Sequence, residues 1–167
     1  MINKSVLERF WKDYYIQTQE EHSDFPYANV SDAGRALIKG RNWTGTFTEM
    51  LLTISESISI NKKELTVCEH DLNLVERDVL AFAGTTSYVS KNKDLMKAHI
   101  WANAVQAQKD LITVNEKRII TLKGVLEELG SEKEILELIL KKLDKTTDWL
   151  VQYINWQKYE LRFMKND

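Results

Sequence analysis

The residues of this chain that could take part in chemistry gather most closely at Cys68-Glu69-His70-Asp71, which combines a thiol, an imidazole and two carboxylates. The apolar pattern around these residues predicts a helix, in which consecutive side chains point about 100° apart. Neighbouring side chains on a helix therefore cannot converge on one metal ion. Cys68 falls within the apolar repeat, so we expect it to be a small buried side chain with exposed polar neighbours.

The other two histidines, His22 and His99, have no partner at the spacing of metal ligands. Neither belongs to an H-x-x-x-H or E-x-x-H pattern, so a di-metal carboxylate bundle lacks its ligands. The sequence also contains no G-x-x-x-x-G-K-[ST] phosphate loop and no G-x-S-x-G nucleophile motif. We therefore expect a protein that is not an enzyme and has no catalytic residue, metal site, cofactor or small-molecule substrate.

The composition favours a helical protein of the cytoplasm. The 167 residues contain one proline and six glycines, which favours long uninterrupted helices. A formal net charge of −2 gives no overall attraction to nucleic acid, so a nucleic-acid role would need a local basic patch. No run approaches about 20 apolar residues, no secretory or transit segment is recognised, and the single cysteine excludes an internal disulfide.

The N-terminal third has two different patterns. Apolar residues at three- and four-residue steps predict a first helix over about residues 5–21, with Phe10, Trp11 and Tyr14 on its apolar face. The segment 22–45 contains the proline and three glycines around a short apolar cluster. This segment is predicted to be a connector with one or two helical turns.

Two heptad runs follow, over residues 47–82 and 98–129, in which apolar residues alternate four- and three-residue steps. The runs have similar lengths and are separated by a short break, after which Ser90 is the expected N-cap. Such a pair must fold back on itself to bury both apolar stripes. The predicted fold is all-α, with an N-terminal helix and connector (1–45), an antiparallel coiled-coil helical hairpin (46–130) and a C-terminal aromatic-rich helix (131–167) in one cooperative unit.

Asn61 is the one polar member of the first stripe, and Asn115 lies near the middle of the second, which also contains Gln108. In the register that we predict, Val79 lies beside Trp101 and Leu65 beside Asn115. The two asparagines then occupy adjacent layers. A polar pair there could form a hydrogen bond across the hairpin and select this register, at some cost in stability.

The pair Gly130-Ser131 has two interpretations. Gly130 followed by the capping-box spacing of Ser131 and Glu134 predicts that one helix ends and another begins. The heptad phase nevertheless continues beyond this point, which would give one long helix over residues 92–164. Because two local signals coincide at Gly130, we favour a break or kink there.

The C-terminal segment carries an apolar arc wider than one helix contact needs. The arc could pack against Phe10, Trp11 and Tyr14 of the first helix, or it could form an interface in a homo-oligomer or with a partner protein. The residues predicted for such an interface are Trp149, Tyr153, Ile154, Trp156, Leu161 and Phe163.

Cations occur close to aromatic residues at the C-terminal end of the chain and form a second cluster near the break between the heptad runs. Lys158 and Arg162 alternate with aromatic side chains, a mixture that can hold phosphates while bases stack. Lys91, Lys93 and Lys97 form the other cluster. Each cluster also fits a solvated helix surface, and cations near a helix C-terminus are favoured by the helix dipole.

Four segments carry a resemblance to a known family. They are Leu7-Glu8-Arg9-Phe10-Trp11-Lys12-Asp13, Lys62-Lys63-Glu64-Leu65, Lys91-Asn92-Lys93-Asp94-Leu95 and Ile154-Asn155-Trp156-Gln157-Lys158-Tyr159. In their order along the chain they resemble bacteriophage recombination-mediator proteins of the UvsY type.

The resemblance implies a homo-oligomer that binds single-stranded DNA and helps a recombinase load onto strands covered by single-strand-binding protein, in the cytoplasm of the host cell. By position, the residues implied for DNA contact are Lys91, Lys93, Lys97, Lys158 and Arg162, and the region from Trp149 to Leu161 is implied for assembly. The alternative is a coiled-coil structural, adaptor or regulatory protein that binds protein partners only.

Overall fold

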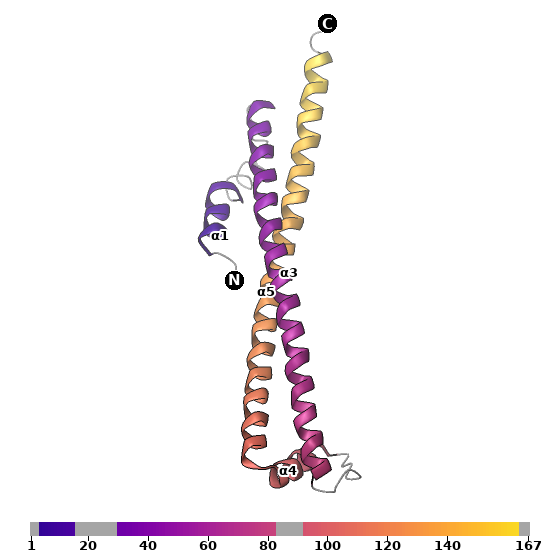
Figure 1. The fold of residues 1–167 in the computed structure, drawn as a ribbon. Coiled ribbons are helices and arrows are strands. Elements are labelled where there is room, and N and C mark those ends of the chain that lie inside the picture. The colour runs from indigo at the N-terminus through magenta and orange to yellow at the C-terminus, as the bar shows by residue number, and fades with distance from the viewer. Residues whose placement is uncertain (1–3, 16–29, 83–91, 164–167) are drawn as a thin grey trace. The chain divides into compact units, whose positions relative to one another are not determined.

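The computed structural model describes residues 4–15, 30–82 and 92–163, and the secondary structure of these ranges is helical (Figure 1). The all-α prediction is therefore confirmed. The two longest helices, α3 and α5, pack together. The elements in chain order are α1 (Lys4–Phe10), the π-helix η1 (Trp11–Tyr15), α3 (Val30–Phe82), α4 (Lys93–Asn103) and α5 (Gln106–Phe163).

The chain divides into two compact units. Unit 1 consists of Met1–Glu56 and Gly130–Asp167, and unit 2 consists of Ser57–Leu129. The helices α3 and α5 contribute to both units, whereas α1 and η1 belong to unit 1 and α4 belongs to unit 2.

The predicted connector over residues 22–45 is wrong for residues 30–45, which form the first turns of α3. The remaining residues, 22–29, lie outside the described ranges. A glycine within a helix costs only about 1 kcal/mol relative to alanine, and burial of nearby side chains such as Ala33 and Phe47 offsets this cost.

Gly40 has a packing role within α3. A Cβ atom at this position would collide with the Tyr14 hydroxyl and lie 3.1 Å from Cγ2 of Thr147. The absent side chain therefore makes room for Tyr14, which is itself buried. By contrast, a Cβ atom at Gly45 would meet nothing within 4 Å.

The predicted break at Gly130 is also wrong, because α5 runs from Gln106 to Phe163 without interruption. Leu129, Leu136, Leu143 and Leu150 follow one another at seven-residue steps and are all buried. This continuous stripe favours the helical conformation more strongly than the local capping signal opposes it.

The break occurs instead at Ala104, which caps α4 in an extended conformation (φ −70°, ψ 137°). At the other end of α4, Asn92 is the N-cap and its side chain accepts hydrogen bonds from the backbone N–H groups of residues 94 and 95. The helix α5 then starts with the Val105 N–H donating to the Gln108 side chain at 3.1 Å. This is half of a capping box, without the usual polar N-cap residue.

The separate helix α4 shifts the pairing of α3 with α5 away from the predicted register. Leu65 packs against a cluster of Cys68, Ile119 and Leu122, one to two turns beyond the predicted neighbour Asn115. Asn61 donates to the backbone oxygen of Ser57 on its own helix, at 2.8 Å. In this pairing, Asn61 and Asn115 do not occupy the adjacent layers that we predicted.

The pairing in unit 2 also gives the relative direction of its two long helices. Val79 clusters with Ile100, Ala104 and Ile112, whereas Cys68, which precedes Val79 on α3, clusters with residues that follow Ile112 on α5. Within unit 2, residue numbers on α5 therefore fall as those on α3 rise.

Candidate nucleic-acid interface

An aromatic cluster joins α1 and η1 to α3 in unit 1. The Phe10 side chain is almost fully buried, and its ring lies edge-on to the rings of Trp43 and Phe47, with centroids 5.4 and 5.0 Å away. Trp43 stacks on Phe47 at 5.7 Å, and Trp11 lies edge-on to Phe10 at 5.8 Å. Edge-to-face and offset arrangements of this kind are favourable for aromatic rings, so this cluster fixes the short N-terminal helix on α3.

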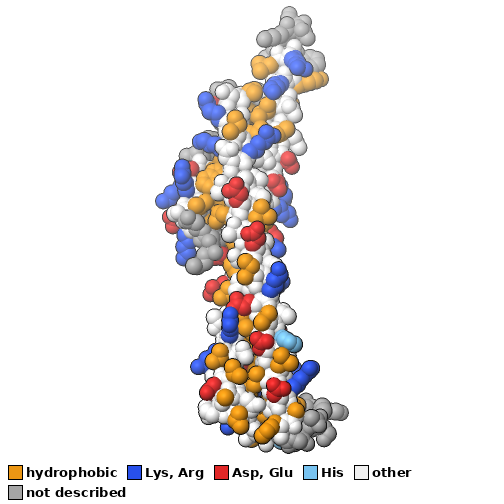
Figure 2. All heavy atoms as spheres, in the orientation of Figure 1, with side chains coloured by type: hydrophobic (Ala, Val, Ile, Leu, Met, Phe, Trp, Pro, Cys, Tyr) orange, Lys and Arg blue, Asp and Glu red, His pale blue; other side chains and the backbone are white. Residues whose placement is uncertain are grey.

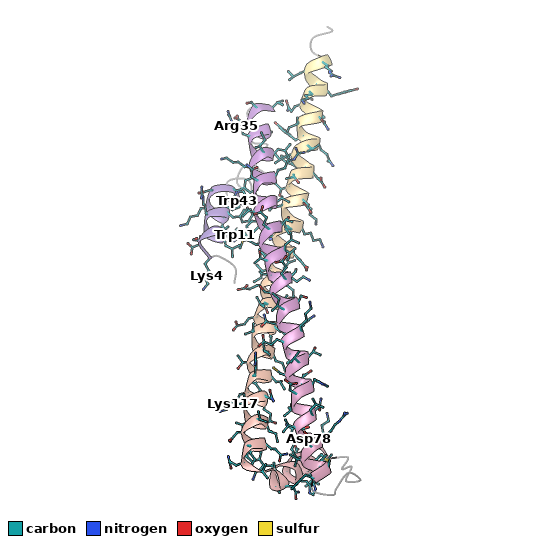
Figure 3. The ribbon with its side chains drawn as sticks, in the orientation of Figure 1. Lys4, Trp11, Arg35, Trp43, Asp78 and Lys117 are labelled. Atoms are coloured by element: carbon teal, nitrogen blue, oxygen red, sulfur yellow. The ribbon has the colours of Figure 1, made fainter. Side chains whose placement is uncertain are left out.

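A groove of about 440 Å³ opens beside this cluster, and we call it the Trp43 groove. It is lined by Arg9, Asp13, Lys39, Asn42 and Trp43. Figure 3 shows Trp11 and Trp43 between α1 and α3, with Arg35 further toward the start of α3. The groove therefore combines a half-buried indole with an ammonium and a guanidinium group.

Helical spacing explains why these side chains meet. Lys39 and Trp43 are four residues apart on α3 and therefore share one side of the helix, together with Arg35 one turn earlier. Arg9 forms an ion pair with Asp13 at 3.5 Å, while Lys12 follows on η1. Figure 2 shows Lys and Arg side chains gathered over α1 and the first turns of α3.

The chemistry of the Trp43 groove suits a polyanion that carries flat rings. An indole face can stack on a base of any sequence, and nearby cations can contact the phosphates. Asp13 neutralises part of the charge of Arg9, which leaves Lys39 as the lining cation that has no carboxylate partner among the described residues. Sequence reasoning missed this site because it assigned residues 22–45 to a connector, where the four-residue spacing of Lys39 and Trp43 has no meaning.

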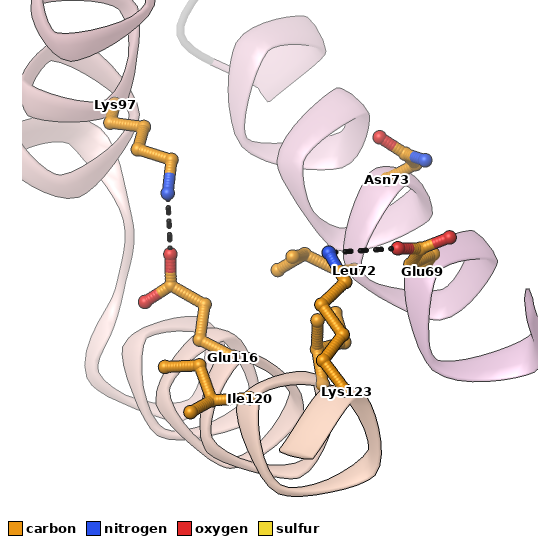
Figure 4. Close-up of a pocket in the computed structure, with 8 residues that line it drawn as sticks. Glu69, Leu72, Asn73, Lys97, Glu116, Ile120 and Lys123 are labelled. Carbon is orange, nitrogen blue, oxygen red and sulfur yellow. Dashed lines mark hydrogen bonds and ion pairs between the residues drawn. The ribbon is translucent and has the colours of Figure 1, made fainter. Parts of the chain in front are cut away.

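The lysines predicted for DNA contact in unit 2 are less suited to that role. Lys91 lies outside the described residues, and Lys93 is exposed at the start of α4. The Lys97 ammonium group lies 2.9 Å from a carboxylate oxygen of Glu116. Figure 4 shows this pair beside a cavity of about 490 Å³, with the ion pair of Lys123 and Glu69 on another wall. Both lysines of this cavity are therefore engaged by carboxylates.

A third carboxylate, Glu76, shares a smaller cavity of about 280 Å³ with Lys97 and Glu116. Burial raises the pKa of Glu76, and the negative charge of Glu116 adds to this effect while Lys97 opposes it. The hydrogen bond to Glu116 and the charge of that carboxylate raise the pKa of Lys97. At neutral pH, Lys97 is thus a cation close to the carboxylates of Glu116 and Glu76. Burial disfavours the charged form of Glu76.

Replacing Glu76 by glutamine is expected to increase thermal stability at pH 7 and to change it less at pH 4. Because the pKa of Glu76 is higher in the folded chain than in the unfolded chain, folding disfavours its charged form, and this penalty disappears as the pH falls through the raised pKa. Melting temperatures measured by circular dichroism between pH 4 and 8 test this expectation. Glu128→Gln, at an exposed position of α5, is the control and should follow the wild-type curve. A Glu76→Gln protein less stable than wild type at pH 7 would contradict it.

The C-terminal aromatic face packs largely within unit 1. Leu150 and Tyr153 form a buried cluster with Ala33, and Trp149 and Ile154 pack against it. The described residues that pack against this face belong to the start of α3, and packing of the first helix against it stays a prediction.

Some residues at the C-terminal end of α5 stay accessible. Trp156 and Leu161 are each about half exposed, so the predicted interface remains a prediction for these two side chains. Phe163 ends α5, and its side chain lies outside what the structure describes. Lys158 and Arg162 are exposed near them.

The groups first considered for chemistry do not assemble into a site in the described ranges. Cys68 is buried beside Ile119 and Leu122, which confirms its predicted structural role. His70 is exposed, His99 is half-buried and within 3.5 Å of the Asn103 amide, and His22 lies outside the described residues. Within residues 4–15, 30–82 and 92–163, no three His, Cys, Asp or Glu side chains could hold a metal ion together.

Comparison of the chain with protein-family models, with curated proteins and with solved structures finds no match. In the part of the chain that the structure describes, no helix is both long and apolar enough to cross a membrane.

Proposed function

We propose that this protein is a non-enzymatic, oligomeric accessory protein of DNA recombination or replication that binds single-stranded DNA in the Trp43 groove. The observation that carries the proposal is the combination of the Trp43 indole with Lys39 and Arg9 around one open groove. The resemblance to UvsY-type mediators supports the same role and adds the expectation that a recombinase and single-strand-binding protein are partners, in the cytoplasm of the host cell.

In this proposal, the α3–α5 pair is an antiparallel coiled-coil hairpin that serves as a scaffold. The hairpin itself presents ion-paired cations such as Arg118 and Lys123, which are poorly placed to exchange a carboxylate for a phosphate. The segment containing α1 and η1 supplies the second wall of the groove. Bases would stack on Trp43 while Lys39 contacts the backbone, joined by Arg9, whose pair with Asp13 is long and exposed to solvent and therefore weak.

Lys39→Ala is expected to weaken binding of a fluorescein-labelled oligothymidine about three- to tenfold in 50 mM salt, because one phosphate contact is lost. The slope of log affinity against log salt concentration should fall by about 0.7, the contribution of one contact to a single strand. Fluorescence anisotropy over 50–200 mM salt measures both quantities. Arg41→Ala is a matched control, since Arg41 is an exposed cation two residues away on α3 and points away from the groove.

The other outcomes separate the competing assignments. Loss of affinity with Lys158→Ala or Arg162→Ala, but not with Lys39→Ala, would move the DNA site to the C-terminal end of α5. Absence of any binding by the wild-type protein at 50 mM salt would overturn the proposed function.

A structural, adaptor or regulatory protein that binds only protein partners is the second candidate. Large apolar side chains exposed on the outside of α3, among them Leu52, Ile60 and Val67, favour this function because such side chains usually mark protein contacts when they recur along one helix. Wild-type protein that fails to bind DNA at low salt but forms a stable complex with another protein would favour this candidate.

A further inference from the structure

Two ion pairs between α3 and α5 distinguish two faces of unit 2. Arg118 donates from Nε to a carboxylate oxygen of Glu64 at 2.9 Å, and Lys123 pairs with Glu69 at 3.3 Å. Glu64 and Glu69 are five residues apart on α3, which places them on different sides of the contact with α5. We call the two sides the Arg118 face and the Lys123 face.

The Lys123 face is partly covered by α4. Lys97 of α4 reaches Glu116 of α5, and the cavity between these elements contains Lys123 and Glu69 in its wall. The side chain of Ile120 projects on this face and is 71% exposed. This face therefore has an intramolecular neighbour and a polar lining.

The Arg118 face carries an apolar stripe on α3. The stripe repeats every seven residues and consists of Ile60, Val67 and Leu74. Ile60 lies four residues before Glu64, and Val67 lies three residues after it, so the stripe shares the side of the helix that carries Glu64. These side chains are 63%, 56% and 44% exposed. Apolar residues at heptad spacing on a helix that already packs against α5 are typical of a second helix contact.

The same face carries apolar residues on α5. Val114 and Leu111 precede Arg118 by four and seven residues, so they lie on its side of α5, and both are more than half exposed. Two clusters fix the pairing of the helices, since Cys68 packs with Ile119 and Val79 packs with Ile112. Leu74 lies between the first residues of these pairs and Val114 between the second, so both are at about the same level along the helices. The stripe thus becomes an apolar surface two helices wide.

We propose that the Arg118 face is the interface with a second copy of this chain, packed across a two-fold axis parallel to the helices. That axis places α3 of one copy opposite α5 of the other, with Leu74 against Val114 of the second copy. All four helices are then antiparallel to their neighbours, as in many four-helix bundles. The contact is isologous, so each copy supplies both halves of it and the assembly closes as a dimer.

Charge complementarity favours a second copy over an unrelated partner. The α3 side of the face carries the carboxylates of Glu64 and Asp71, and the α5 side carries the guanidinium of Arg118. The two-fold axis brings the acidic side of one copy to the basic side of the other, in both halves of the interface. Opposite charges that flank an apolar seam commonly fix partner and orientation in helical assemblies.

Val67→Glu is expected to weaken self-association at least about tenfold, because a carboxylate would be buried against apolar side chains. Molar mass measured by sedimentation equilibrium between 1 and 100 µM gives the dissociation constant. Ile120→Glu is the matched control, since it places the same charge on the Lys123 face. Both positions are exposed in one chain, so helicity measured by circular dichroism should stay unchanged in both variants.

A cross-link tests the same contact without disturbing charge. A chain with Leu74→Cys and a chain with Val114→Cys, mixed under oxidising conditions, should form a disulfide-linked dimer, since Cys68 is buried and will not compete. Wild-type protein that is a monomer at 100 µM would overturn the proposal. Self-association that survives Val67→Glu, and is abolished by Trp156→Glu, would also overturn it and assign assembly to the C-terminal end of α5.

The interface does not depend on nucleic-acid binding. None of these substitutions touches the Trp43 groove, so DNA binding by a monomeric variant, or a dimer without DNA binding, identifies which of the two proposals has failed.

Discussion

Leu150→Ala is expected to lower the free energy of unfolding by about 2–5 kcal/mol. The Leu150 side chain is fully buried between Ala33 of α3 and Tyr153 of α5, and the neighbouring rings of Trp149 and Tyr153 stack at 5.5 Å. Packed rings cannot move into the space that the substitution leaves without losing this contact, so a cavity remains. Urea denaturation followed by circular dichroism at 222 nm measures the change.

Leu138→Ala is the matched control for this prediction. Leu138 lies on the same helix and is mostly exposed, so its truncation should change the free energy of unfolding by no more than about 0.5 kcal/mol. Similar losses for the two leucines would mean that the start of α3 does not cover the C-terminal part of α5.

Gly40→Ala is expected to destabilise the protein by about 1–3 kcal/mol, although alanine is the better helix former. The added methyl group would collide with the Tyr14 hydroxyl, and the buried Tyr14 ring lies against Phe10 with centroids 5.9 Å apart. Tyr14 can therefore yield only if the aromatic cluster that joins α1 to α3 also moves. Urea denaturation measures the loss, and faster proteolysis in the first 15 residues would accompany it.

Gly45→Ala is the control for the glycine prediction. A Cβ atom at Gly45 meets nothing within 4 Å, so this variant should be more stable than wild type, by up to about 1 kcal/mol. A gain of the same size for Gly40→Ala would contradict the packing role of Gly40.

Heptad spacing predicted the helical class and much of the buried stripe. Ile54 and Val79 on α3, and Ile112 and Leu122 on α5, are buried as their spacing requires. This success has a simple reason, since the period of an apolar stripe depends only on helix geometry.

Helix ends were predicted less well, because capping signals compete with packing. Gly130 and the glycines before residue 45 had local signals for a break, yet burial along the same helices keeps them helical. The real break, at Ala104, has no glycine, proline or polar N-cap residue to reveal it. Since the register depends on where the second long helix begins, the predicted placement of Asn61 and Asn115 in adjacent layers failed together with that boundary.

The candidate site was not predicted for the same reason, a helix boundary placed at the wrong residue. Lys39 and Trp43 share a helix side only if residues 30–45 are helical, and Arg9 joins them only through tertiary packing that no spacing rule contains. The lysine clusters were visible in the sequence, but the carboxylate that engages Lys97 lies 19 residues further along the chain.

The division of the chain into units has a consequence for the order of events during synthesis. Unit 2 is one continuous segment, Ser57–Leu129, whereas unit 1 joins Met1–Glu56 to Gly130–Asp167. Contacts between residues near each other in sequence form early, so unit 2 can fold while the ribosome is still translating the last part of α5. Leu150 can pack against Ala33 only after that part of α5 has left the ribosome. A nascent chain that stalls near residue 130 would therefore leave the first turns of α3 without the C-terminal residues of α5 that pack against them. We expect chaperones to bind the nascent protein at these exposed N-terminal turns.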